Sequence, residues 1–419
     1  MNGGVSTTQP PAQVPSAQTL AAASESSRRS IAIAMYCVLL AGYMLMAADR
    51  YLFPVLAPDV RRNFGFTLAD TGLLSTIFTL GLGLGGLPTG FLLSRSSRKT
   101  VMLLGIAIFS GGIGLTTVVR GFWGMLFSLA FTGIGMAMFA TSMFALAAAY
   151  FGRFRAAAIG SVNFCYGLGG FLGPIAATFI LGAYGTWRAP MLSSGIFGFV
   201  LAGLILVSVR PWFSETQHSA ASRARTGGAP TLLNRNSILL AILSIIHGLS
   251  MYGFLGMYPT FLRESLHYTP KAAGFVVSFF GVGALASIGG GWIGDRFSPR
   301  LVLGTSFAGI TILGYLFFLQ APGMGTRELL TFIYGVIGSA VLYVNLAGYH
   351  VKAVQGNLAG RGSGLFVTSL YGAAAFGGYL IGALATKDGW MHAAEVQICL
   401  LCLIGAILAF ALHPEQMSL

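Results

Sequence analysis

The feature that most constrains this chain is a succession of apolar runs, each about as long as a helix that crosses a lipid bilayer. Such a helix needs roughly 20 apolar residues to traverse a hydrocarbon core of about 30 Å. The 419-residue chain is 55% hydrophobic and 8% charged, a balance typical of integral membrane proteins. Twelve runs can be placed, at 31–56, 71–93, 101–119, 123–150, 157–183, 190–209, 238–262, 272–293, 301–319, 329–349, 363–385 and 391–412. Because they lack the alternation of membrane-barrel strands, we predict an all-α membrane protein with twelve transmembrane helices.

Polar segments divide these runs into two sets of six. Residues 1–29, rich in Ser, Thr, Gln and Pro, are expected to be a disordered cytoplasmic tail. Residues 210–237 are polar and basic and are expected to form a cytoplasmic linker. The predicted six-helix bundles therefore comprise residues 30–209 and 238–413, and a short tail covers 414–419.

The distribution of basic residues predicts the orientation in the membrane. The formal net charge is +13. With the amino terminus in the cytoplasm, fifteen of the 24 Lys and Arg residues fall on the cytoplasmic side and eight on the other side. This excess follows the positive-inside rule. We expect a multi-pass protein of the cell inner (cytoplasmic) membrane with both termini cytoplasmic, and we interpret the basic balance as a topology signal without a nucleic-acid partner.

An internal repeat relates the two halves. The segment Gly90–Lys99 follows the second run, and the segment Gly291–Arg300 follows the eighth. A shift of 201 residues places Ser94 on Asp295, Arg95 on Arg296 and Lys99 on Arg300. Two related bundles around a midplane site are the architecture of secondary transporters.

These loops resemble the signature of the major facilitator superfamily, Gly-x-x-x-Asp-Arg-x-x-x-Arg between the second and third helices of each half. In the first half, Ser94 stands at the Asp position. The resemblance implies that the Asp caps a helix and that the basic residues latch the cytoplasmic side. The gating residues it implies are Arg95, Lys99, Asp295, Arg296 and Arg300. The alternative is that these loops only anchor helix ends on the cytoplasmic side.

Within the superfamily, the segment around Asp49-Arg50 resembles the anion:cation symporter group, and so does Thr186-Trp187-Arg188. The resemblance implies that Arg50 contacts an anionic substrate and that Asp49 takes part in proton coupling. The acidic residue that this group usually carries in its fourth helix is replaced here by Met136. A relay with two carboxylates is therefore not expected.

The residues around Arg50 independently indicate a functional site. A charged side chain at the bilayer centre costs roughly 2.5–3.5 kcal/mol on insertion scales. Tyr36, Tyr43 and Arg50 are spaced by seven residues, so on a helix they form one stripe, which we expect to face the interior. A guanidinium is always charged and pairs bidentately with a carboxylate. The alternative is a structural lock in which Arg50 pairs with Asp49 or extends to the membrane surface.

Further polar side chains in the runs are candidates for the substrate path. His247, Met251 and Tyr258 share one face of the seventh run. Because a histidine titrates near neutral pH, His247 is the second candidate for proton coupling. Amide and phenol groups that could bind substrate are Asn163, Asn345 and Tyr371. Each of them could instead serve as a hydrogen bond between helices, and His247 could be a buried, hydrogen-bonded residue.

The sequence contains neither a catalytic constellation nor a nucleotide-binding loop, so we expect no enzyme activity and no cofactor. The four cysteines lie within the runs and are expected to be apolar fillers, and no metal site is predicted. We predict a monomeric secondary transporter that imports a small organic anion with protons by alternating access. The alternatives are a proton-driven exporter of drugs or metabolites, and a carrier of a metal or metal chelate.

Overall fold

The computed structural model describes residues 17–151, 155–215, 227–319 and 323–418, and nearly all of them are helical. The first half contains α1 (Ala17–Phe64), α2 (Leu68–Thr76), α3 (Phe78–Arg95), α4 (Arg98–Leu115), α5 (Gly121–Tyr150), α6 (Arg155–Tyr184), α7 (Arg188–Ser208) and the short α8 (Pro211–Ser214). The second contains α9 (Arg235–Glu264), α10 (Pro270–Ala284), α11 (Ser287–Arg296), α12 (Pro299–Phe318), α13 (Met324–Tyr334), the π-helix η2 (Gly335–Tyr343), α14 (Val344–Lys352), the 3₁₀ turn η3 (Gly356–Leu358), α15 (Ala359–Ala394), the π-helix η4 (Glu395–Leu400), α16 (Leu401–Ala409) and the 3₁₀ turn η5 (Pro414–Gln416).

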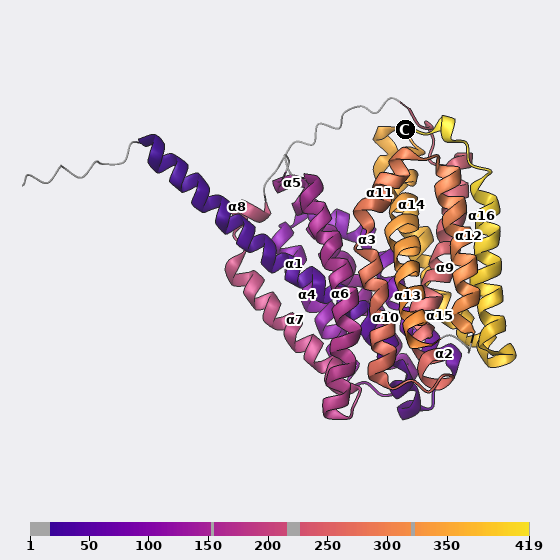
Figure 1. The fold of residues 1–419 in the computed structure, drawn as a ribbon. Coiled ribbons are helices and arrows are strands. Elements are labelled where there is room, and N and C mark those ends of the chain that lie inside the picture. The colour runs from indigo at the N-terminus through magenta and orange to yellow at the C-terminus, as the bar shows by residue number, and fades with distance from the viewer. Residues whose placement is uncertain (1–16, 152–154, 216–226, 320–322, 419) are drawn as a thin grey trace, which may run out of the picture.

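The described helices supply twelve membrane spans. Ten are long and apolar enough on their own, and α10 and α11 form an eleventh that is bent by 45°. The continuous stretch Ala359–Ala409 has 51 residues. At 1.5 Å per residue, a straight helix of that length would span about 75 Å, more than twice a hydrocarbon core. Gly389, at φ 84° and ψ 165°, breaks the stretch into two spans, and α16 packs on α12 and α9 (Figure 1). The predicted all-α fold with twelve transmembrane helices is confirmed.

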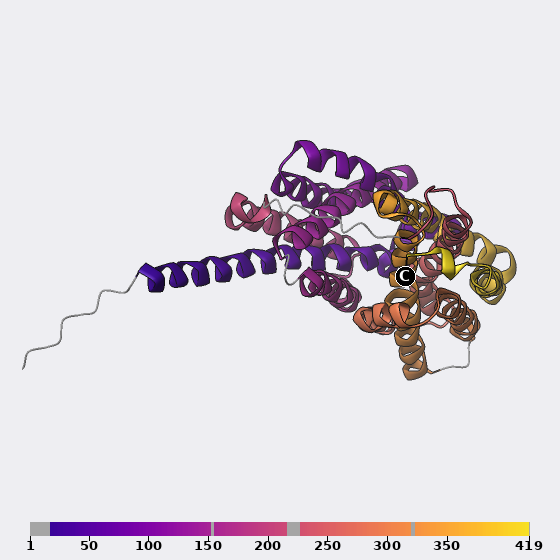
Figure 2. The ribbon, with the colours of Figure 1, turned by 90° about the horizontal axis from the view of Figure 1, so that it is seen from above.

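The amino-terminal segment differs from the expected disordered tail. Helix α1 begins at Ala17, and its first turns project from the bundle (Figures 1 and 2). Residues 1–16 lie outside the described residues. The stretch TLAAAS near the start of α1 contains Ala and Leu, which are both strong helix formers. Extending an existing helix also costs little free energy, because its nucleus is already formed.

The most extensive contacts between the two halves are those of α2 with α15 and of α6 with α10. Glycines allow both contacts. A Cβ atom on Gly72 would lie 1.9 Å from the carbonyl oxygen of Gly378, and one on Gly281 would lie 2.3 Å from the backbone nitrogen of Phe171. Close backbone approach of this kind is how small residues promote helix association in membranes.

Ion pairs join the halves where α1 and α9 end. Arg263 donates two hydrogen bonds to Asp59, one of them at 3.0 Å, and Arg61 donates to Glu264 at 2.6 Å. We call this face the outer face, following the topology predicted from the basic residues, and the opposite one the inner face. Between the halves, a small pocket lined by Arg50, Ser75 and Tyr252 has a volume of only about 10 Å³. The halves are therefore closed together on the outer face.

We predict that breaking the buried outer pair will open the outer face. Arg263 and Asp59 are 5% and 19% exposed, and removing one partner of a buried pair costs roughly 3–5 kcal/mol. In a cysteine-free background carrying Ser75→Cys, Arg263→Gln should raise the rate of labelling by an impermeant maleimide from outside by about tenfold or more. The swapped pair Asp59→Arg/Arg263→Asp should restore slow labelling.

The matched control is Arg62→Gln. Arg62 is 72% exposed and lies 3.9 Å from Asp59, so it contributes little and the labelling rate should not change. Equal labelling rates in Arg263→Gln and the parent protein would mean that the pair does not hold the outer face closed.

Candidate functional site

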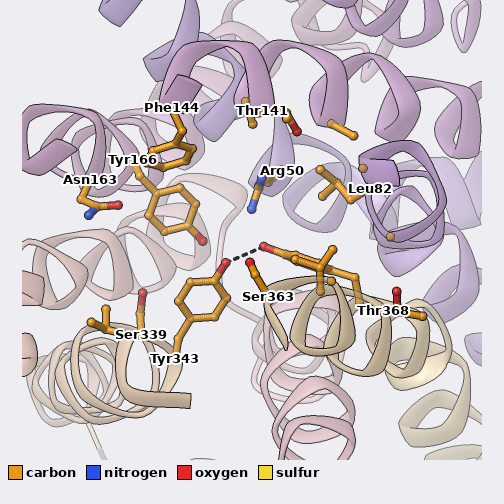
Figure 3. A pocket seen from close by; sticks show the side chains of 18 of the residues that line it. Arg50, Leu82, Thr141, Phe144, Asn163, Tyr166, Ser339, Tyr343, Ser363 and Thr368 are labelled. Atoms are coloured by element: carbon orange, nitrogen blue, oxygen red, sulfur yellow. Dashed lines mark hydrogen bonds between the residues drawn. The ribbon is translucent and has the colours of Figure 1, made fainter. Parts of the chain in front are cut away.

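A cavity of about 430 Å³ lies between the two halves on the inner side of the closed contacts, and helices of both halves line it (Figure 3). Its polar lining residues are Arg50 and Tyr43 of α1, Thr141 of α5, Asn163 and Tyr166 of α6, Tyr252 of α9, Ser287 of α11, Ser339 and Tyr343 of η2, and Ser363, Thr368 and Tyr371 of α15. Apolar walls include Phe144 and Leu82. The volume suits a small molecule, since ligand pockets generally range from about 300 to 1,000 Å³.

Arg50 is the only charged residue among the described lining residues of this cavity. Its guanidinium carbon lies 5.4 Å from the centre of the Tyr166 ring, and its Nε is buried without a hydrogen-bond partner. Within the described residues, it forms no ion pair. Pro54, four residues further along α1, has no N–H to donate to the Arg50 carbonyl, which loosens the helix at this point. The central cavity therefore contains the positive charge of Arg50, and no acidic side chain among the described lining residues balances it.

Tyrosine hydroxyls surround this cation. Tyr343 and Tyr371, from the second half, share a hydrogen bond of 3.0 Å (Figure 3). Tyr166, from the first half, lies 3.3 Å from Tyr51, hydroxyl to hydroxyl. The Tyr252 ring packs edge-on against Tyr371 at 6.1 Å. Phenols can donate to an anion while their rings provide apolar walls, so this arrangement suits a flat anionic ligand.

Asp49 does not accompany Arg50 in the central cavity. Adjacent helical residues point about 100° apart, and Asp49 faces α7, where Ser194 donates a hydrogen bond to its Oδ1. Its Oδ2 is buried without a partner, and no ion pair with Arg50 exists in the part of the chain that the structure describes. The arrangement in which Asp49 locks Arg50 is absent from this conformation.

The structure places the predicted substrate residues in two groups. Those that line the central cavity are Arg50, Tyr43, Asn163, Met251 and Tyr371. Those that lie outside its lining are Tyr36, His247, Tyr258 and Asn345.

The residues outside the cavity have other surroundings. Tyr36 donates to the Ala158 carbonyl at 2.7 Å, and Asn345 donates to the Gly290 and Val341 carbonyls, both at 2.9 Å. Tyr258 stacks on Phe254 and packs edge-on against Phe317. These three side chains therefore make contacts between helices in the present conformation.

His247 is fully buried in the second half. Its ring packs edge-on against Phe307 at 6.5 Å and lies near Gly338. Neither ring nitrogen has a hydrogen-bond partner among the described residues. Met251, one turn away from His247, faces the central cavity. The imidazole and the thioether, which could both bind a metal, therefore do not point to the same place. No cluster of three or more metal-ligating side chains occurs within the described ranges, where all four cysteines are free.

Among the described residues, the hydrogen bonds and ring contacts of the candidate gating residues lie within their own half. Lys352 donates to Asp295 at 2.8 Å, Lys99 to the Leu206 carbonyl at 2.8 Å, and Arg300 to the Leu412 carbonyl at 2.6 Å. Arg95 and Arg296 lie over the rings of Phe91 and Trp292. Ser94 donates to the Phe91 carbonyl at 2.7 Å. The predicted inner latch is therefore open in this conformation.

Comparisons with known proteins agree with this geometry. The sequence profile of the Major Facilitator Superfamily matches residues 39–378. The 4-hydroxybenzoate transporter PcaK of Pseudomonas putida is 23% identical over 402 residues, covering 87% of this chain and 88% of that protein. The gallate transporter of Pseudomonas putida is 23% identical over 319 residues, covering 67% and 70%. A bacterial homologue of the human lysosomal transporter Spinster, solved inward-facing and occupied, has a similar fold, with a TM-score of 0.71 at 16% identity over 90% of this chain and 95% of that one.

Two asparagines provide a test of the cavity. Asn163 lines the cavity, whereas Asn345 is 5% exposed and bonded between helices. We predict that Asn163→Cys will react with a water-soluble maleimide in inside-out vesicles roughly tenfold or more faster than Asn345→Cys, because a buried thiol reacts only through local opening. Similar rates for the two variants would contradict a cavity that opens to the inner face.

Proposed function

Because this chain belongs to the Major Facilitator Superfamily, we propose that it is a proton-coupled carrier that imports a small organic anion by alternating access. The protein is a multi-pass membrane transporter of small molecules and not an enzyme. The observation that carries the finer proposal is the uncompensated Arg50 guanidinium in the central cavity. We place the protein in the cell inner membrane with both termini cytoplasmic, an orientation that the distribution of basic residues supports.

Arg50 would bind the carboxylate of the substrate. A guanidinium offers a planar pair of N–H donors that matches the two oxygens of a carboxylate, and charge-assisted hydrogen bonds of this kind are strong. The hydroxyls of Tyr166, Tyr343 and Tyr371 would add donors, and the rings would pack against the body of the ligand. Two relatives are named for 4-hydroxybenzoate and gallate, both aromatic carboxylates, which supports a substrate of this class.

Asp49 would carry the coupled proton. It lies next to Arg50 on α1 but contacts Ser194 of α7, so the carboxyl can gain or lose a proton without contact with the substrate. His247, with two unpartnered ring nitrogens, is the second candidate. Transport would then alternate between the present state, closed by the outer ion pairs, and a state in which the gating residues close the inner face.

Uptake into proteoliposomes tests the proposal. Labelled 4-hydroxybenzoate, gallate and aliphatic acids of similar size would be supplied with and without an inward proton gradient. We expect accumulation of at least one aromatic acid that depends on the gradient. Accumulation that is driven only by exchange for a solute leaving the vesicles would favour an exporter and would contradict the proposal. Accumulation of cationic compounds alone would do the same.

We predict that Arg50→Lys will weaken substrate binding while leaving expression and folding intact. Lysine keeps the charge but loses the planar fork. The loss of one charge-assisted hydrogen bond, about 1.5–3 kcal/mol, should raise Kd roughly ten- to a hundredfold in equilibrium binding of the transported acid. Arg120→Lys, at an exposed site on the outer face, is the control. Wild-type affinity in Arg50→Lys would show that Arg50 is only a lock or an anchor.

Asp49→Asn should uncouple transport from the proton gradient. The amide is close in shape to a protonated carboxyl but cannot release a proton, so half of the cycle should persist. We expect exchange of internal for external substrate to continue while accumulation against a gradient is lost. If Asp49→Asn still concentrates substrate, the proton site lies elsewhere, and His247→Gln would be the next variant to measure.

A further inference from the structure

A second cavity, of about 600 Å³, lies between α1, α6 and α7 and does not include Arg50. Its rim consists of apolar side chains that are exposed on the outside of the bundle: Leu172 at 41%, Ile196 at 56%, Phe197 at 50% and Val200 at 60%. Large apolar side chains on the outside of a membrane-spanning bundle face lipid. This lateral cavity therefore opens toward the hydrocarbon of the bilayer.

One acidic side chain is buried in this apolar surrounding. Asp49 lines the lateral cavity and is 7% exposed. Its Oδ1 accepts from Ser194, and its Oδ2 is buried without a hydrogen-bond partner in the described parts of the chain. The described lining contains no basic residue. A carboxylate at membrane depth is costly unless a cation or proton accompanies it.

The polar groups of the lateral cavity match a primary ammonium ion. An ammonium group has three N–H donors and no acceptor. Asp49, Ser193 and Ser194 all line this cavity, and their carboxylate and hydroxyl oxygens are hydrogen-bond acceptors. A bare metal ion would find too few oxygen ligands here, since hard cations take about six or more. A neutral lipid chain would contact the apolar walls of the lateral cavity but would leave the Asp49 carboxylate without a partner.

We propose that the lateral cavity is a binding site for a membrane-borne amphiphile with a protonated primary amine, whose ammonium group pairs with Asp49 and whose apolar body lies between α6 and α7. The ligand reaches this site from the bilayer, whereas the substrate of the proposed function reaches Arg50 through the central cavity. The inference goes beyond the proposed function and does not depend on it.

Photolabelling in phosphatidylcholine nanodiscs tests the site. The probe is dodecylamine carrying a diazirine on its chain, and cross-links are located by peptide mass mapping. We expect cross-links on the α7 segment 190–200, removed by excess dodecylamine but not by dodecanol. Asp49→Asn should lower this labelling about tenfold or more, which corresponds to ~1.4 kcal/mol of lost affinity.

Two further variants separate the site from folding and from transport. Ala176→Trp places a large ring in the lateral cavity at an exposed position and keeps the carboxylate, so it should also abolish labelling. Arg50→Lys leaves the lining of the lateral cavity unchanged and should label as the parent protein does. In the parent protein, absent labelling with intact acid uptake would overturn this inference alone, and absent acid uptake with intact labelling would overturn the proposed function alone.

Three results would overturn the proposal. Equal competition by dodecanol would show that the cavity takes up any apolar chain. Unchanged labelling of Asp49→Asn would show that the carboxylate does not bind the amine. Cross-links on Tyr166 or Tyr371 instead of the α7 segment would place the amine in the central cavity.

Discussion

A permanent positive charge inside a membrane protein requires a negative partner, and this chain leaves that requirement open at Arg50. The neighbouring carboxylate cannot meet it here, because adjacent residues of a helix diverge by about 100° and Asp49 faces another helix. The described lining of the central cavity supplies phenols, amides and hydroxyls but no acid. In the proposed function, an anion from solution would be this partner. Size, aromatic walls and hydroxyl donors then restrict which anion fits.

Helix α1 is the common wall of the two cavities. Arg50 lies on the side of the central cavity, and Asp49 on the side of α7 and the lipid. Because both side chains belong to one helix, a rotation or tilt of α1 changes the surroundings of both at once. The ion pairs near its outer end fix α1 to α9, so the same helix also takes part in closing the outer face. The proposed substrate site and the outer closure therefore share a single helix.

The fold could be predicted from sequence because lipid requires helices to satisfy their backbone internally, which leaves long apolar runs as a direct signal. The stripe through Tyr43 and Arg50 also gave the correct face of α1 for the central cavity. That pattern does not show how far the cavity extends along the helix. Tyr36 lies on the same stripe but fourteen residues away, about 21 Å along the helix, and a small cavity does not reach it.

The second half was harder to predict, for two reasons. Helix α9 is largely buried on all sides, so its polar residues His247 and Tyr258 face neighbouring helices and not the cavity, and periodicity cannot separate these directions. Tyr343 was missed because it lies in η2, where the helical period is not 3.6 residues.

The contact between Asp59 and Arg263 could not be predicted either. It joins residues that are 204 positions apart, and no local pattern contains such a contact.

The π-helical geometry of η2 has a consequence for chain length. A π-helical turn accommodates an additional residue within a continuous helix. If the segment 335–343 formed a regular α-helix with all its residues retained, the additional residue would rotate α14 against α13 by about 100°. Asn345 would then turn away from the Gly290 carbonyl, and Tyr349 from the Gly294 carbonyl. The register between the outer and inner parts of this span is thus set by the π-helical geometry together with the number of residues, so a homologous chain with a regular α-helix here would keep both contacts only with one residue fewer.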